Sequence, residues 1–329
     1  MGISQNIITP MYRGKTTSCH SQALLTAFFG KKKIIEPWMF ENFTTIPFGI
    51  KHNPSDPNRL LNCYLDPDFG LDRALEILQI PYEVEYWKPG TDGSDAIRLL
   101  REWCSESPVV LGPLNMDGLS YLFHKELYYR VDHYIIALKA EDTKIQICDP
   151  EGFILVFLSI DDLLDAWRGD RIPEGRGEFV MRRVLEIPKL RFDKKTFRRV
   201  LQLAIQNLTE SREQKLGGAN ALLVLANQQE LIGNDPSLKR GMTYVIPTRI
   251  QRIVFTRIFV QTLRQKFPIG AIKHSYLELL EIIDTQIRLF SEMISNILNK
   301  VQNSLENLKI IADLENHMID LYEDIGDKI

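Results

Sequence analysis

The chain has 329 residues, of which 44% are hydrophobic and 25% are charged, so its composition is that of a globular protein, and its length favours two domains. This composition excludes a disordered, collagen-like or fibrous chain. The 40 Lys and Arg residues against 43 Asp and Glu residues give a net charge of −3, which argues against a nucleic-acid-binding protein.

Residues 1–188 alternate between short helical and strand-like runs, separated by Gly, Pro, Asp and Asn. This order predicts an α+β domain with one N-terminal helix and an antiparallel sheet. Apolar periodicity predicts helices over 16–30, 71–80, 94–104 and 160–169. Strand-like patterns cover 81–87, 107–112, 132–140, 143–149, 153–159 and 178–187, with the turn sequence DPEG between the fourth and fifth of them.

Strand signals nearly vanish after Pro188, and residues 189–329 predict an all-helical domain. We expect helices over 194–210, 213–232 and 248–266. Beyond Gly270, apolar residues recur at steps of three and four from Ile283 to Leu321, which predicts one long C-terminal helix. The same apolar stripe is consistent with a homodimer.

Charge is divided unevenly within the helical domain. The stretch Lys189–Lys266 carries 15 basic and 5 acidic residues, whereas residues 267–329 carry 5 basic and 11 acidic ones. Two interpretations remain open for the basic stretch. Its residues form ordinary solvated helix faces, partly paired with the acidic C-terminal part, or they form a docking surface for an acidic partner.

The cysteine content and the apolar runs point to a cytoplasmic protein with reduced thiols. Four cysteines are too few for a disulfide scaffold in a chain of this length, and no two have the spacing of a zinc site. We find no phosphate-binding glycine loop and no dinucleotide fingerprint, so we expect neither a metal nor another cofactor. The longest apolar runs are shorter than the ~20 residues of a membrane helix, so we expect no membrane partner.

Cys19 lies where a catalytic thiol is favoured, just inside the first turn of the first predicted helix. The N–H groups and dipole of a helix N-terminus lower a thiol pKa and can stabilise an oxyanion. His133 begins the predicted strand 132–140, and Asp149 ends the next one, so antiparallel pairing brings both to one edge of the sheet. Asp149 could then hold one ring nitrogen of His133 and leave the other facing Cys19. A bystander cysteine that merely fills the core is the alternative.

Four segments that contain these residues resemble one known family. TTSCHSQALLTAFFG, SPVVLGPLNMDGLSY, VDHYIIAL and KIQICDPEG are similar to the butirosin biosynthesis protein H N-terminal family, over about residues 10–185. The resemblance implies a papain-like cysteine fold, akin to the leader peptidases of bacteriocin exporters. It implies an acyltransferase of antibiotic biosynthesis that moves an acyl group from a carrier-protein thioester to an amine. Cys19 would be the nucleophile, His133 the base and Asp149 the orienting acid.

The chain departs from the family pattern next to the nucleophile. Papain-like enzymes place a Gln shortly before the cysteine as an oxyanion donor, whereas this chain has Tyr12, Arg13, Thr16 and Thr17 there. A His often precedes the cysteine in the family, but here Ser18 precedes it and His20 follows. The second oxyanion donor is therefore open.

Four further residues are candidates for substrate contact: Asn115 and Asp117, in the turn after strand 107–112, and Ser18 and His20, beside Cys19. Turn formation is the alternative role for the first two, and a surface or capping role is the alternative for His20. Two other functions also stay open, a cysteine peptidase or amidase with the same three residues, and a non-catalytic binding or assembly module. An acidic carrier protein is the partner that the resemblance implies for the basic stretch.

Overall fold

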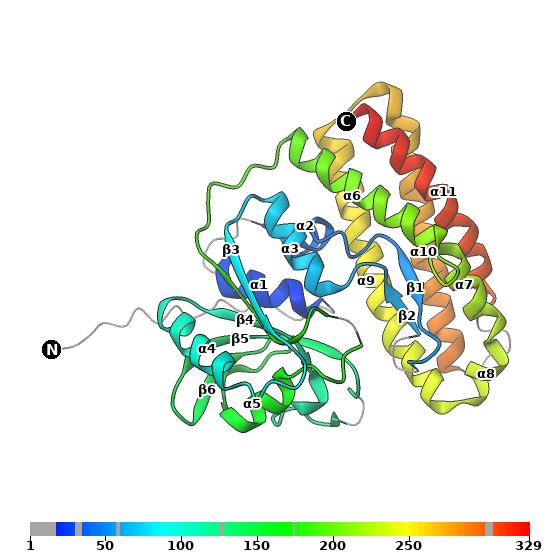
Figure 1. The fold of residues 1–329 in the computed structure, drawn as a ribbon. Helices are drawn as coiled ribbons and strands as arrows, with labels where there is room; N and C mark the ends of the chain where they lie inside the picture. Colours follow the sequence, from blue (N-terminus) through cyan, green and yellow to red (C-terminus); the bar gives the residue numbers. More distant parts are fainter. Residues whose placement is uncertain (1–17, 30–34, 57–59, 126–127, 174, 300–304) are drawn as a thin grey trace. The chain divides into compact units, whose positions relative to one another are not determined.

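The computed structural model describes residues 18–29, 35–56, 60–125, 128–173, 175–299 and 305–329 (Figure 1). The chain divides into two compact units, each made of two segments. Unit 1 comprises Met1–Pro37 and Gln79–Leu190, and unit 2 comprises Trp38–Leu78 and Arg191–Ile329. An antiparallel sheet with helices in unit 1 and a mainly helical unit 2 confirm the predicted α+β class.

Unit 1 is built on a six-stranded sheet with the order β3-β8-β4-β5-β6-β7, in which all neighbouring strands are antiparallel. Each strand overlaps one of the predicted runs, but β4 continues past the predicted end at residue 112, so Asn115 ends the strand and does not lie in the turn after it. The central strands are buried on both faces, which explains their nearly continuous apolar sequence. The strands are β3 (Tyr82–Trp87), β4 (Val109–Asn115), β5 (Asp132–Ala140), β6 (Lys144–Cys148), β7 (Ile154–Ser159) and β8 (Glu178–Val184).

Helices cover both faces of this sheet. Helices α4 (Ser94–Glu106) and α5 (Ile160–Trp167) pack on one face in a shared hydrophobic core, and α1 (Cys19–Phe29) packs on the other against β4 and β5 (Figure 1). The short 3-10 helix η1 (Met116–Gly118) follows β4. Nearly every residue of α1 is buried, although the sequence predicts only an amphipathic helix. This burial fixes the helix that carries Cys19.

Unit 2 contains a segment that the sequence analysis places in the first domain. Residues 38–78 form α2, which begins at Pro37, a two-stranded antiparallel sheet and α3, and they pack with the C-terminal helices. Phe48 stacks edge-on against Phe259 at 6.4 Å, and Asn207 donates a hydrogen bond to the Thr45 carbonyl at 3.0 Å. The predicted boundary near residue 189 agrees with the structure, but the predicted single stretch 1–188 does not. The elements are α2 (Pro37–Phe43), β1 (Ile50–His52), β2 (Leu61–Cys63) and α3 (Pro67–Ile77).

The helices between residues 190 and 272 differ from the prediction in two respects. One predicted helix is divided into two, and another begins earlier than predicted. Helix α6 agrees with the prediction, but the predicted helix 213–232 is divided into α7 and α8. Helix α9 continues through Pro247, where the sequence predicts a helix start. These helices are α6 (Lys194–Glu213), α7 (Gly218–Asn227), α8 (Gln229–Asn234) and α9 (Pro236–Lys266), followed by the 3-10 helix η3 (Gly270–Ile272).

The predicted long C-terminal helix is wrong, because the structure has two antiparallel helices instead, α10 (Lys273–Leu298) and α11 (Asn307–Lys328). Ser275, near the start of α10, donates to Asp324 near the end of α11 at 2.5 Å, and Asn307 donates to the Leu289 carbonyl at 3.2 Å. The apolar stripe is buried largely within unit 2 and therefore does not itself call for a homodimer.

Several arginines of the basic stretch are paired inside unit 2. Arg249 donates to buried Glu315 at 2.8 Å, and Arg252 lies 3.4 Å from buried Glu41. Arg257 forms a salt bridge with an α10 carboxylate. These pairs support the first interpretation of the stretch for part of its charge, while Lys194 and Lys195 stay exposed at the start of α6.

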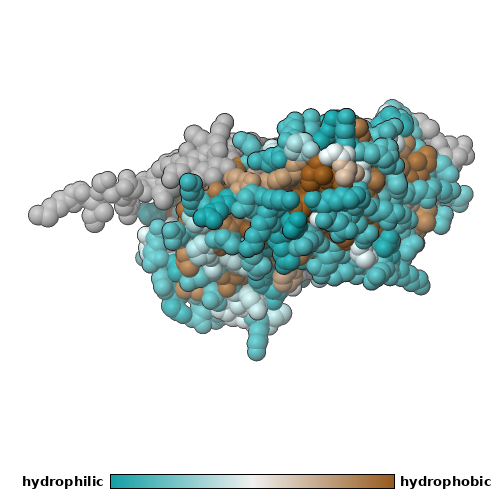
Figure 2. Space-filling model, turned by 90° about the horizontal axis from the view of Figure 1, so that it is seen from above, coloured by the Kyte–Doolittle hydropathy of each residue, from teal (hydrophilic) through white to brown (hydrophobic). Residues whose placement is uncertain are grey.

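Hydrophilic residues predominate on the face shown in Figure 2, with hydrophobic residues in smaller groups among them. None of the described helices combines the length and the hydrophobicity needed to cross a membrane.

Candidate active site

Cys19 is the first residue of α1 and lies at a partly exposed end of a buried helix. The Gln22 N–H donates to the Ser18 carbonyl at 3.0 Å and closes the first turn. N–H groups of a first helical turn lack partners within the helix, so they favour an anion at this position. The predicted location of the thiol at the helix start is therefore confirmed.

His133 is held beside a distortion in the central strands. Leu114 of β4 pairs with His133 of β5, and the register shifts between Leu111 and Leu114. Gly112 lies in this bulge with a φ of +141°, and a Cβ there would come within 2.7 Å of the His133 carbonyl oxygen. A side chain at position 112 would thus displace the strand that carries His133, so the bulge requires glycine.

The turn after β6 orients Asp149. Its Oδ1 accepts a hydrogen bond from the Glu151 N–H at 2.7 Å, and its carbonyl accepts one from the Gly152 N–H at 3.1 Å. These contacts form the turn that the sequence DPEG predicts, and they fix one carboxylate oxygen toward β5.

Cys19, His133 and Asp149 form one hydrogen-bonded chain. The carboxylate can only accept, so His133 Nε2 donates to Asp149 Oδ1, at 2.9 Å. The other ring nitrogen, Nδ1, is then the one that shares the hydrogen bond between His133 and Cys19. His133 is 1% exposed and Asp149 is fully buried. The spatial relation predicted from the sequence is confirmed.

All three groups in this chain favour their charged forms. Burial lowers the pKa of His133, but the charges of Asp149 and Cys19, together with their hydrogen bonds, hold it well above its usual value. Burial raises the pKa of the Cys19 thiol, but the charge of His133 and hydrogen bonds with His133 and His20 lower it overall. Burial also raises the pKa of Asp149, yet the charge and hydrogen bond of His133 bring it below its usual value. The charge and hydrogen bond of His133 thus shift Cys19 toward the thiolate, which is the reactive form of the group.

The other described cysteines that have a shifted pKa differ in kind from Cys19. Burial raises the pKa of the Cys104 thiol to about 12. Burial and the adjacent Asp149 charge raise the pKa of Cys148 to about 11. Cys104 is partly exposed, as Cys19 is, so it serves as a reference thiol.

We expect iodoacetamide to alkylate Cys19 at pH 7 much faster than Cys104, because the thiolate is the reactive form. With a pKa of about 12, Cys104 is ionised to only about one part in 10⁵ at pH 7. The rate at Cys19 should fall only below its own lowered pKa, and His133→Ala should move that profile to higher pH. Peptide mass spectrometry across pH measures both rates; equal rates at the two thiols would contradict the assignment.

Tyr121 is a fourth member of the site that sequence reasoning missed. Its hydroxyl donates to Asp149 Oδ2 at 2.5 Å, and its ring packs on Phe153 at 5.1 Å between centroids. Burial and the Asp149 charge raise the pKa of Tyr121 well above its usual value, so the hydroxyl keeps its proton. Tyr121 lies in an irregular segment just after η1, where no periodicity or spacing marks a functional residue.

Tyr121→Phe should lower the unfolding midpoint and reduce activity about 10-fold, because it removes a donor from a buried carboxylate, a bond worth ~1.5–3 kcal/mol. The hydrogen bond from Tyr121 helps to lower the pKa of Asp149. A carboxyl group with a lowered pKa stabilises the fold above its usual pKa and loses that effect as the pH falls. Because Tyr121→Phe brings this pKa back toward its usual value, the variant should be less stable than the wild type near neutral pH but should lose less stability on acidification below about pH 5. Thermal unfolding against pH measures this, and an unchanged acid limb would refute it.

The candidate substrate residues Asn115 and Asp117 are engaged with the protein itself. Asn115 is fully buried, donates to Asp170 Oδ1 at 2.8 Å and accepts from the Arg171 N–H at 3.1 Å. Asp117 forms a salt bridge with Arg171 at 2.7 Å. These contacts connect the end of β4 to the segment after α5, which fits the alternative role in turn formation.

The two residues that flank Cys19 are also buried. Ser18 is 1% exposed and His20 is 2% exposed, so the surface position in the alternative given for His20 is wrong. His20 hydrogen-bonds the Cys19 side chain, and its ring stands edge-on to Tyr134 of β5 at 5.9 Å. His20 thus helps to lower the thiol pKa. Tyr12, Arg13, Thr16 and Thr17 lie outside the described residues.

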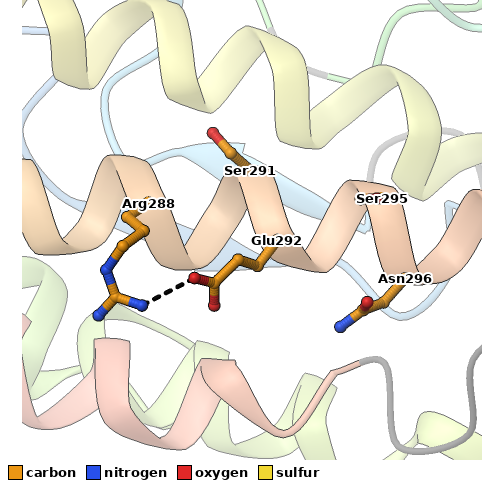
Figure 3. A pocket seen from close by; sticks show the side chains of 5 residues that line it. All are labelled: Arg288, Ser291, Glu292, Ser295 and Asn296. Atoms are coloured by element: carbon orange, nitrogen blue, oxygen red, sulfur yellow. Dashed lines mark hydrogen bonds and ion pairs between the residues drawn. The ribbon is translucent and has the colours of Figure 1, made fainter.

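Clusters of metal-ligating side chains and a hollow in unit 2 are the other features of the described residues that could form a site. The described residues contain no group of three or more His, Cys, Asp or Glu side chains that could hold a metal ion. A hollow of about 530 Å³ runs along α10 in unit 2 and is lined by Arg288, Ser291, Glu292, Ser295 and Asn296 (Figure 3). Arg288 and Glu292 pair with each other at 2.8 Å, and no nucleophile–base pair lines it.

Comparison with known proteins yields a sequence match over about half of the chain. No family model matches the chain. The uncharacterized protein YobF of Bacillus subtilis (strain 168) is 30% identical over 169 residues, which make up 51% of this chain and 53% of that protein. The chain thus spans about half the length of the curated relative it matches. The name of that relative gives no reaction, and the resemblance to the butirosin biosynthesis protein H N-terminal family stays a prediction.

Proposed function

We propose that the protein is a cysteine-dependent acyltransferase that moves an acyl group from a carrier-protein thioester to an amine, in the biosynthesis of an antibiotic-type natural product. The observation that carries the proposal is the hydrogen-bonded chain Cys19–His133–Asp149 at the start of a buried helix. Unit 1 would then be a papain-like domain. The four free cysteines support an assignment to the cytoplasm.

The first step is acylation of the thiol. The Cys19 thiolate attacks the thioester carbonyl, and the new C–S bond gives a tetrahedral oxyanion that the N–H groups of the first α1 turn stabilise. The C–S bond to the carrier breaks, and the carrier thiol leaves with the proton from imidazolium His133. The enzyme is left with an acyl group on Cys19 and a neutral His133 that can act as a base.

The second step is transfer to the acceptor. His133 takes a proton from the amine as its nitrogen attacks the acyl-Cys19 carbonyl, and collapse of the intermediate expels the Cys19 thiolate. Asp149 stabilises the imidazolium that forms. The base is 1% exposed, which limits the access of bulk water to it.

An acidic carrier protein is the partner proposed for the basic stretch Lys189–Lys266. Because Arg249 and Arg252 are tied to buried carboxylates, the exposed Lys194 and Lys195 are the residues proposed to attract it. A carrier-bound thioester should then react with a lower KM than the same acyl group on a short pantetheine thioester, and added salt should reduce the difference.

The test is to incubate the protein with acyl thioesters on a carrier protein and on pantetheine, and then to add an aminoglycoside or an amino-acid amide. Intact mass should show one acyl group on Cys19, and chromatography should show amide in excess of free acid. Free acid with every amine would make the protein a hydrolase, and cleavage of peptides without reaction of thioesters would make it a peptidase. A protein that takes no acyl group from any of these donors would refute the proposal.

A further inference from the structure

Gln22 of α1 has a side-chain amide with no hydrogen-bond partner among the described residues. Both its Nε2 and its Oε1 are buried, and the residue is 1% exposed. Buried polar groups in native proteins are nearly always hydrogen-bonded, so an orphaned amide calls for an explanation such as a bound reactant. Residues 18–29 contain no other Asn or Gln.

The position of Gln22 on the helix brings it to the turn that carries the nucleophile. Gln22 follows Cys19 by three residues in α1, and residues three apart lie on the same side of a helix. Long side chains in a helix lean toward its N-terminus and cover the preceding turn. A donor on Gln22 is therefore placed beside the helix start, where the oxyanion of the proposed acylation forms.

We propose that Gln22 Nε2 donates a hydrogen bond to this oxyanion and so acts as the second donor beside the Cys19 N–H. The inference rests on the proposed acyl transfer. It gives the orphaned amide a partner during the reaction, since Nε2 has no hydrogen-bond partner among the described residues and gains one only when the carbonyl oxygen becomes charged. The proposed donor is a Gln that follows the cysteine in the sequence, whereas papain-like enzymes place a Gln before it.

The experiment separates an oxyanion donor from a residue that merely supports the thiol. Gln22→Met keeps the length of the side chain and removes the donor. Acylation of Cys19 by a pantetheine thioester should fall about 10²–10³-fold, the usual effect of losing one oxyanion donor. Alkylation by iodoacetamide should stay within two-fold of the wild-type rate, because displacement of iodide forms no oxyanion. The unfolding midpoint should be unchanged or higher, because an unpaired amide leaves the interior.

Control variants make the outcome decisive. Thr26→Val removes a buried hydroxyl one turn further along α1 and should change neither rate, and Gln22→Ala should repeat the split if the Met side chain does not fit. Acylation of Gln22→Met within three-fold of the wild-type rate would overturn the inference. A parallel loss of acylation and alkylation would also overturn it, because Gln22 would then only position the thiol. If the wild-type protein itself takes no acyl group, the proposed function fails, and the role of Gln22 fails with it.

Discussion

Replacement of Cys19 by alanine is expected to abolish the acyl-enzyme and to slow acyl transfer by about 10⁴-fold or more. The reason is that the Cys19 thiolate, paired with His133, forms the covalent bond with the acyl group. The pKa of Cys104 is raised to about 12 and that of Cys148 to about 11, so neither thiol can replace Cys19 near neutral pH.

The matched control for this prediction is Cys104→Ala, which removes a partly exposed thiol from α4. It should leave acylation unchanged. Intact mass after a short incubation with a pantetheine thioester, and amide production at steady state, are the two readouts. Transfer by Cys19→Ala at the wild-type rate would exclude covalent catalysis at this thiol.

The loss of acyl transfer in Cys19→Ala should come from the missing thiol and not from unfolding of the protein. Cys19 is partly exposed and begins its helix, so alanine there creates no large cavity and the unfolding midpoint should change little. His133 keeps its hydrogen bond to Asp149 in the variant, so the imidazole keeps its place. A folded variant without an acyl-enzyme therefore isolates the contribution of the sulfur atom.

The sequence predicts the positions of Cys19, His133 and Asp149 well because local signals determine them. The helix start marks Cys19, a strand start marks His133, and the turn DPEG at the end of the next strand marks Asp149. Antiparallel pairing of neighbouring strands then brings the latter two together. Each step needs only the pattern of a short segment and the most common connection between such segments.

The features that the sequence does not predict depend on contacts between distant segments. Residues 38–78 have the same mixture of helix and strand patterns as the residues of unit 1. They belong to unit 2 because they pack on residues from 191 onward. Tyr121 lies in an irregular segment, and its role follows from a contact with Asp149 across 28 residues. The break between α10 and α11 interrupts an apolar period that continues on both sides of it, so the pattern predicts one helix.

Substitution of Asp149 is expected to have the second largest effect, and its size should depend on the replacement. Asp149→Ala removes the acceptor of His133 Nε2–H and should reduce acyl transfer about 10³–10⁴-fold. The ring then loses both the group that selects its tautomer and the charge that holds its pKa well above the usual value. Amide production at saturating thioester measures this loss.

Asp149→Asn should cost less, about 10–100-fold, because the geometry around Oδ1 can survive. The Glu151 N–H donates to Oδ1 at 2.7 Å and selects an oxygen at that position, so the asparagine oxygen can still accept from His133 Nε2. The asparagine NH₂ then faces the Tyr121 hydroxyl in place of Oδ2. What is lost is the negative charge, so the pKa of His133 falls and the thiolate becomes less favoured.

The alkylation profile of Cys19 distinguishes the charge of Asp149 from its geometry. In Asp149→Asn the pH dependence of alkylation should move to higher pH, because the imidazolium that stabilises the thiolate is itself less stable. The dependence of the unfolding free energy on pH should change at acidic pH, near the pKa of a carboxyl group. A lowered carboxyl pKa stabilises the fold above the usual pKa of about 4 and loses that effect on acidification, so the asparagine variant should lose less stability between pH 5 and 3 than the wild type. Equal activity of the alanine, asparagine and wild-type proteins would show that Asp149 has no part in the reaction.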